Sequence, residues 1–208
     1  MYNLAPSYKS DFCTLQYIRE KISCKDFHGA NGNSLIHLCR NFGCFLGIEQ
    51  ENLHILELFA VYHDLGKIVI PDEIIFKVNA LTKEEWDEIK AHPIIGSRLA
   101  ESFPDISHIS HLILTHHERW DGTGYPCGLV GENIPFLSRV LSIADAFDAM
   151  TSNRPYALHD GLSREEALFR IAKAAGTQFD PNLAGMFVSE KFWRIYDRAA
   201  VGDVSQNR

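Results

Sequence analysis

The chain has 208 residues, 46% of them hydrophobic, which is enough for one compact domain with a substantial core. Its formal net charge is -7 and it has no run of Lys or Arg, which argues against a general nucleic-acid-binding protein. Its five cysteines form no CxxC pair, and no apolar run is long enough to cross a bilayer, so we expect a cytoplasmic protein with reduced thiols and no membrane partner.

The first part of the chain is predicted to be an arm followed by two amphipathic helices. Residues 1–30 show little helical periodicity, and we interpret them as an arm or an irregular helix. The next apolar stretch has helical spacing and ends at Gly47, as at a C-cap. A second helix is expected over about 51–64, which places His63 and Asp64 together at its C-terminal end.

The middle of the chain contains signals that start and stop helices. The residues Thr82-Lys83-Glu84-Glu85 have the form of a capping box and predict a helix start. His92 precedes Pro93, and a residue in that position is pushed out of the α region, so the helix should kink or stop there. A further helix is predicted after Pro104, and its core-facing spacing gives His116 an inward direction.

The last part is also predicted to be helical. Pro135 suits a first helical position, and the helix after it brings Asp145 and Asp148 onto one face. Ser163 begins a second capping box, and Asp180 is an N-cap followed by proline. No alternating strand pattern is long enough to trust, so the predicted fold class is all-α, with about seven or eight helices.

Six residues are candidate metal ligands because they lie at helix ends or breaks, or on apolar faces. An unpaired imidazole or carboxylate is costly there unless a cation satisfies it. They are His63, Asp64, His92, His116, His117 and Asp145. A lone histidine is more often a surface group or a satisfied core group, and we interpret His54, His108, His111 and His159 in that way.

The chemistry of this ligand set favours catalysis over a structural role. Histidines with a carboxylate that can bridge suit Fe or Mn, with Zn, Ni or Mg as alternatives, whereas a closed structural zinc site would use more cysteine. We expect two divalent metal ions that share Asp64. Such a pair can acidify a bridging water to hydroxide and clamp the oxygens of a phosphodiester during in-line displacement.

These motifs, in this order, resemble the HD-GYP branch of the HD-domain metal phosphohydrolases. The likeness runs from about residue 35 to residue 187 and includes a C-terminal signature at 176–181. The resemblance implies an HD-domain helical bundle, here residues 31–208, in bacterial signalling. It also implies an enzyme, a phosphodiesterase that hydrolyses cyclic di-GMP to pGpG and on to GMP.

The resemblance also implies roles for individual residues. Asp64 would bridge the metals, with His63 and Asp145 on one of them, and Lys67 would act beside the scissile phosphate. The remaining three imidazoles, of His92, His116 and His117, would hold the other metal. Residues expected to bind substrate are Asp121, Gly122, Gly124, Tyr125, Pro126, Asp148 and Arg154, and Asp148 is also a candidate hydrogen-bond partner that orients the site.

Two positions depart from the family pattern. Asn31 stands where a further histidine is common, although His28 could replace that histidine after a local shift, and Phe27 makes a third metal improbable. Ala157 replaces a residue that is often basic, and the loss of that charge would weaken substrate binding or alter base preference.

These departures keep two alternatives open. One is a non-catalytic adaptor or sensor that binds cyclic di-GMP or a signalling partner such as a diguanylate cyclase. The other is a hydrolase of the mixed GMP-AMP cyclic dinucleotide. The complete set of six ligands together with Lys67 favours catalysis.

Overall fold

The computed structural model describes residues 14–18, 20, 34–152 and 161–204, and this part of the chain is helical. From residue 34 on it contains ten α-helices and three 3-10 helices, residues 14–18 are helical as well, and its only β pairings are the isolated bridges Asp121–Val130 and Ala175–Phe179. None of the described helices has both the length and the apolar character needed to cross a membrane. The all-α prediction is confirmed, with more short helices than the seven or eight expected.

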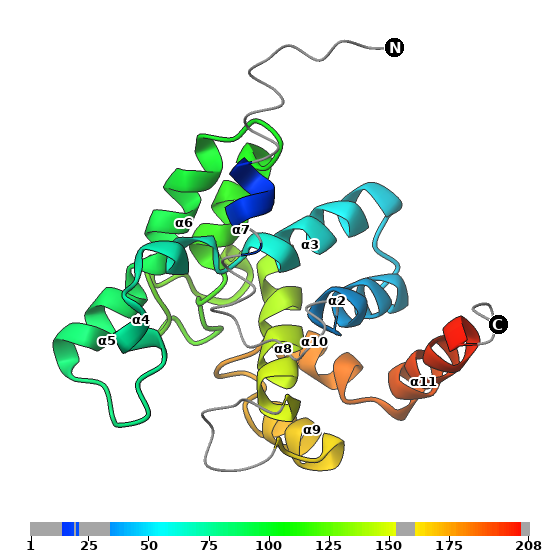
Figure 1. Ribbon diagram of the computed structural model, residues 1–208. Coiled ribbons are helices and arrows are strands. Elements are labelled where there is room, and N and C mark those ends of the chain that lie inside the picture. Colours follow the sequence, from blue (N-terminus) through cyan, green and yellow to red (C-terminus); the bar gives the residue numbers. More distant parts are fainter. Residues whose placement is uncertain (1–13, 19, 21–33, 153–160, 205–208) are drawn as a thin grey trace, which may run out of the picture.

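Figure 1 labels the α-helices α2 to α11, and three 3-10 helices (η1 to η3) lie between them in the chain. In chain order they are α2 (Ser34–Phe45), α3 (Gln50–Tyr62), η1 (Leu65–Val69), α4 (Asp72–Ile75), α5 (Lys83–Lys90), α6 (His92–Glu101), η2 (Ser107–Ile109), α7 (Ser110–Thr115), η3 (Gly131–Asn133), α8 (Phe136–Thr151), α9 (Arg164–Lys173), α10 (Pro181–Phe187) and α11 (Glu190–Val204). The expected arm boundary at residue 30 falls within 21–33, outside the described residues.

The core forms around α8, which packs against α2, α7, α9 and α10. Aromatic side chains from α2, α8, α10 and α11 meet there, and the Phe42 and Phe187 rings lie edge to face with centroids 5.0 Å apart. Edge-to-face packing adds about 0.5–1.5 kcal/mol to the burial of each such pair. In Figure 1 this bundle lies opposite α4 and α5, which project from the other side.

Several helix ends match the sequence signals. Thr82 and Glu85 form both bonds of the expected capping box, and the Asp180 carboxylate caps α10 by accepting from two backbone N–H groups. Gly47 has a φ of 75°, the left-handed conformation of a C-cap glycine. Pro135 lies one residue outside α8, as its N-cap, because its ψ of 138° is extended.

A close backbone approach places η1 against α6. A Cβ on Gly66 would lie 2.0 Å from the backbone oxygen of His92 and 2.7 Å from the nitrogen of Gly96, so glycine alone fits there. Because η1 follows His63 and Asp64 directly, this contact brings both side chains close to His92.

Candidate metal centre

Three histidines project from helix ends, and each has its ring orientation fixed by a backbone carbonyl three residues earlier. His63 Nδ1 donates to Ala60 at 2.9 Å, His92 Nδ1 to Ile89 at 2.6 Å, and His116 Nδ1 to Ile113 at 2.7 Å. A carbonyl oxygen can only accept, so the proton of each ring is on Nδ1 and the lone pair is on Nε2. The three imidazoles are therefore held in the tautomer that binds a metal through Nε2.

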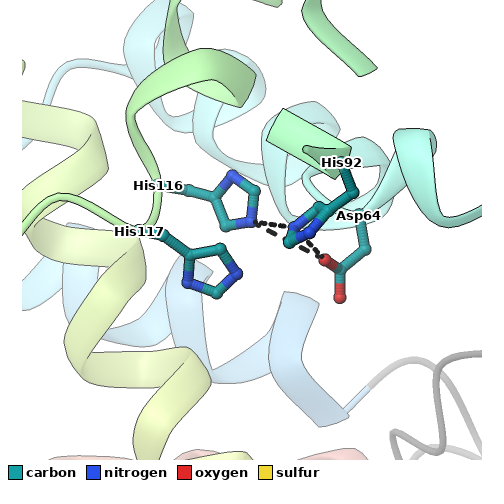
Figure 2. A group of neighbouring side chains, drawn as sticks. All are labelled: Asp64, His92, His116 and His117. Carbon is teal, nitrogen blue, oxygen red and sulfur yellow. Dashed lines mark hydrogen bonds and ion pairs between the residues drawn. The ribbon is translucent and has the colours of Figure 1, made fainter. Parts of the chain in front are cut away.

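Four side chains from three separate segments converge on one point, as Figure 2 shows. The ligand atoms of Asp64, His92, His116 and His117 all lie within 4.8 Å of one another. His92 Nε2 lies 3.0 Å from Asp64 Oδ1 and 3.1 Å from His116 Nε2, and His116 Nε2 lies 3.6 Å from the same Asp64 oxygen. Residues far apart in the sequence thus direct their donor atoms into a shared space.

The second oxygen of Asp64 faces a different set of groups. His63 Nε2 lies 3.2 Å from Asp64 Oδ2 and 3.8 Å from Asp145 Oδ1, and the Lys67 ammonium donates to Asp64 Oδ2. Asp64 therefore lies between two groups of potential ligands, one at each carboxylate oxygen.

The site is buried, and burial controls its charges. Burial lowers the pKa of His116 to about 4, and burial together with the neighbouring His116 lowers that of His117 well below the ordinary value. Burial opposes ionisation of Asp64, but Lys67 and His63 hold the pKa of this carboxyl well below its usual range. At neutral pH Asp64 is thus a carboxylate and His116 and His117 are neutral imidazoles, which are the forms that bind metal ions.

This arrangement fits a divalent cation. Two Nε2 lone pairs face each other across 3.1 Å, and both point toward Asp64 Oδ1, a buried oxygen with no hydrogen-bond donor. Such a convergence of acceptors is costly unless a cation lies among them. Three imidazoles and a carboxylate suit Fe, Mn or Zn, and the ion would be held by His92, His116, His117 and Asp64.

The glycine-rich loop expected to line the site lies beside the histidines. The Tyr125 ring lies over that of His117, with centroids 4.9 Å apart and an angle of 32° between the planes. Gly124 passes so close to residues 118 and 119 that a Cβ would lie 2.4 Å from Arg119 N. Gly122 has a φ of 79°, and Pro126 follows Tyr125 in a cis peptide bond. Among the residues expected to bind substrate, Tyr125 thus packs directly against His117, a candidate metal ligand.

Asp121 is held within the loop and projects toward solvent. Its Oδ1 accepts from Thr123 N at 3.0 Å and from Thr123 Oγ1 at 2.6 Å, and these bonds lower the pKa of Asp121 to about 2. The loop backbone is fixed at the same place, since Trp120 N donates to Gln178 O at 3.1 Å and Asp121 N to Thr177 O at 2.9 Å. The C-terminal signature thus supports the loop that borders the metal centre.

The other expected residues lie deeper in the protein or outside the described residues. Asp148 is only 2% exposed, on the buried side of α8, which favours the orienting role over direct contact with substrate. Arg154 and Ala157 fall within 153–160, and His28 and Asn31 within 21–33, so all four lie outside the described residues.

The structure also assigns a clear task to Glu118, which the sequence pattern left without one. This side chain is buried, and its two carboxylate oxygens accept from Cys127 N at 2.7 Å and from Leu129 N at 2.9 Å. Glu118 thereby fixes the loop that carries Tyr125 next to the histidine pair. The sequence offered one signal for this role, the position of Glu118 between the histidine pair and the glycine-rich loop. A carboxylate at that position can accept from two backbone N–H groups of the loop.

Comparison with known proteins identifies similar chains. A family model described as HD domain matches residues 17–183. The cyclic di-GMP phosphodiesterase response regulator RpfG of Xanthomonas campestris pv. campestris is 43% identical over 138 residues, which cover 65% of this chain and 36% of that protein. A cyclic di-GMP phosphodiesterase of Thermotoga maritima is 37% identical over 166 residues, covering 78% of this chain and 45% of that protein.

A relative of different specificity and a solved structure complete the comparison. The 3'3'-cGAMP-specific phosphodiesterase 2 of Vibrio cholerae is 30% identical, over 84% of this chain and 34% of that protein. The structure of Bd1817, an HDG"Y"P protein from Bdellovibrio bacteriovorus, superposes with a TM-score of 0.60 at 23% identity, over 76% of this chain and 50% of that one, and shows a shared fold. The chain spans less than half the length of the three curated relatives.

Proposed function

The chain belongs to the HD-domain family, in its HD-GYP branch, and we propose that it is a metal-dependent phosphodiesterase that hydrolyses cyclic di-GMP. The main support is the convergence of three imidazoles on the buried Asp64 oxygen that lacks a hydrogen-bond donor. A buried set of neutral nitrogen ligands and one carboxylate is suited to holding a divalent cation for hydrolysis.

We propose two divalent ions, iron or manganese, on the two sides of Asp64. His92, His116 and His117 with Asp64 Oδ1 would hold one ion, and His63 and Asp145 with Asp64 Oδ2 would hold the other. Bound divalent cations neutralise phosphate charge and generate a nucleophile from water near neutral pH. In the net reaction water adds across one P–O bond of the cyclic phosphodiester, and the leaving sugar oxygen takes up a proton, so that linear pGpG forms.

The residues around the ions would orient and stabilise the substrate. The ammonium of Lys67 contacts Asp64 and its side chain is 25% exposed, so this cation lies where it would meet an incoming phosphate. The ring of Tyr125 lies over His117 and forms a wall at the entrance to the cluster. Glu118 holds the Tyr125 loop in place through two backbone bonds.

The experiment that tests this proposal is direct hydrolysis. The protein, reconstituted with Mn²⁺ or Fe²⁺ under reducing conditions, is incubated with cyclic di-GMP, and products are separated by chromatography. We expect pGpG, followed by GMP on longer incubation, and no turnover by Asp64→Asn, which keeps the shape of the side chain but removes its charge. Tight binding of cyclic di-GMP by a metal-loaded protein without turnover would instead identify a sensor or adaptor.

A second substrate is supported by one comparison. The relative named as specific for 3'3'-cGAMP covers 84% of this chain at 30% identity. Competition between cyclic di-GMP and 3'3'-cGAMP in one reaction gives the ratio of their kcat/KM values. We expect the ratio to favour cyclic di-GMP, in line with the higher identity of the cyclic di-GMP phosphodiesterases.

A further inference from the structure

Helix α5 presents an exposed tryptophan and a lysine next to the candidate site. This helix has no buried residues, and Trp86 is 44% exposed. The exposed part of the Trp86 ring is free of the core and available for contact with a ligand. In Figure 1, α5 projects away from the α2, α8 and α11 side of the bundle.

A row of side chains runs from the candidate metal ligands through Tyr125 and the Lys90 ammonium to Trp86. The rings of His116 and His117 have centroids 4.0 Å apart, and those of His117 and Tyr125 are 4.9 Å apart. Lys90 Nζ lies 5.9 Å from the Tyr125 ring and 5.6 Å from the Trp86 ring. The Lys90 ammonium therefore lies between the Tyr125 ring of the glycine-rich loop and the Trp86 ring of α5, at the outer edge of the site.

In the part of the chain that the structure describes, the other cations near the site each form an ion pair with a carboxylate, and Lys90 does not. Lys67 is paired with Asp64, Arg119 with Asp121, and Lys77 with Glu85 across the start of α5. Among the described residues Lys90 has no carboxylate within ion-pairing distance, and its ammonium lies near the Trp86 and Tyr125 rings. In a chain with a net charge of -7, a cation without a carboxylate partner beside a candidate phosphate site is well placed to bind an anion.

We propose that Trp86 and Lys90 form a second subsite, which binds the part of the cyclic dinucleotide that stays away from the metals. This inference rests on the proposed function. A cyclic dinucleotide has two phosphates and two purines, and when one phosphate is at the metal cluster the other lies outside it. Lys90 would pair with this second phosphate, and the exposed face of Trp86 would stack on a purine.

A plain surface pair is the simpler interpretation, because Trp86 and Lys90 are four residues apart on one helix. That interpretation accounts for the contact with Trp86 but not for the approach of Lys90 to Tyr125, which comes from a different segment. Because Lys90 lies next to the Tyr125 ring, which in turn packs on His117, a role of Lys90 in substrate binding is favoured.

The test compares two substrates that differ in the second phosphate. Cyclic di-GMP requires both subsites, whereas methyl p-nitrophenyl phosphate has a single phosphodiester and no purine. For Lys90→Met and Trp86→Leu we expect KM for cyclic di-GMP to rise about tenfold or more with little change in kcat. The ratio of kcat/KM for cyclic di-GMP to that for the small ester should fall to a similar extent. Trp86→Phe, which keeps a ring, should restore most of the affinity.

The controls separate this role from a general loss of charge or of structure. Lys173→Met removes one positive charge from an exposed position on α9 and should leave the ratio at the wild-type value. An unchanged ratio in both Lys90→Met and Trp86→Leu overturns the proposal. Equal losses on the two substrates also overturn it, because they would show that α5 acts only by positioning His92.

The outcome is also distinguishable from a failure of the proposed function. If the wild-type protein does not hydrolyse cyclic di-GMP, calorimetric titration with this dinucleotide still tests the subsite. A dissociation constant that Lys90→Met raises about tenfold would support the subsite in a binding protein. No binding, or a dissociation constant that does not change, would refute it.

Discussion

Replacement of Gly66 by alanine should damage the metal centre although residue 66 is not a ligand. The added Cβ would lie 2.0 Å from the backbone oxygen of His92, so η1 and α6 must separate by at least about 1 Å to relieve the clash. Overpacking of this kind costs about 1–3 kcal/mol of unfolding free energy. The same shift changes the 3.0 Å separation between Asp64 Oδ1 and His92 Nε2.

A metal site tolerates much less movement than the fold does. Ligand distances in a functional site hold to within about 0.2 Å, and a misplacement of about 1 Å can lower turnover about a hundredfold. We therefore expect Gly66→Ala to lose metal affinity about tenfold or more and turnover of cyclic di-GMP about a hundredfold, with a helical circular dichroism spectrum.

The measurements are metal content after dialysis, turnover, and urea denaturation, with Gly185→Ala as the matched control. Gly185 lies exposed in α10, and an added Cβ there meets nothing within 4 Å, so this variant should be as stable as wild type or more stable by about 0.5–1 kcal/mol. Wild-type metal content and turnover in Gly66→Ala would refute the reasoning, because the η1–α6 contact would then not control the distance between Asp64 and His92.

Three further predictions follow from the charges of the site. Glu118→Gln replaces one of two buried carboxylate acceptors by an amide NH2, so one part-buried backbone N–H loses its partner, and urea denaturation should show a loss of about 1–3 kcal/mol that the exposed control Glu132→Gln does not show. In chelator, the unfolded chain takes up a proton at the ordinary His116 pKa of 6.5 whereas the folded chain does so at about 4, so stability should fall as the pH drops from 6.5 to 4, by about 3 kcal/mol for this residue. If the unfolding free energy of the wild type falls no more steeply between pH 6.5 and 4 than that of His116→Gln, the prediction is wrong. Mn²⁺ at about a hundred times its dissociation constant should raise the unfolding free energy by about 2.7 kcal/mol, and a melting temperature that is the same with Mn²⁺ and with chelator would argue against the site.

Local chemistry explains how much of the fold could be predicted from sequence. The Thr82 capping box, the Asp180 N-cap and the left-handed Gly47 each depend on residues within a few positions of one another. The predicted break near Pro93 is confirmed, but it lies at Ala91, between α5 and α6. The expectation that His92 leaves the helical region is wrong, because His92 is the first residue of α6. The helix count was less predictable, because α4 (Asp72–Ile75) has only four residues, too few for a helical periodicity to show in the sequence.

The features that sequence could not provide depend on contacts between distant segments. Burial of Asp148 depends on how α8 packs against its neighbours, and a spacing of three residues from Asp145 does not reveal it. The approach of Lys90 to Tyr125 joins α5 to a loop more than thirty residues later. The Glu118 bonds to Cys127 and Leu129 require the loop to fold back on itself.

The way the helices end explains why residues so far apart can form one site. The last carbonyls of a helix have no partner within it, and the imidazoles of His63, His92 and His116 each donate Nδ1–H to such a carbonyl three residues earlier. One bond therefore satisfies the helix end and also fixes the direction of the Nε2 lone pair. The positions at which α3, α5 and α7 stop thus determine where the ligand atoms lie, so a substitution that extends any of these helices by one residue should disrupt the metal site even if every ligand is retained.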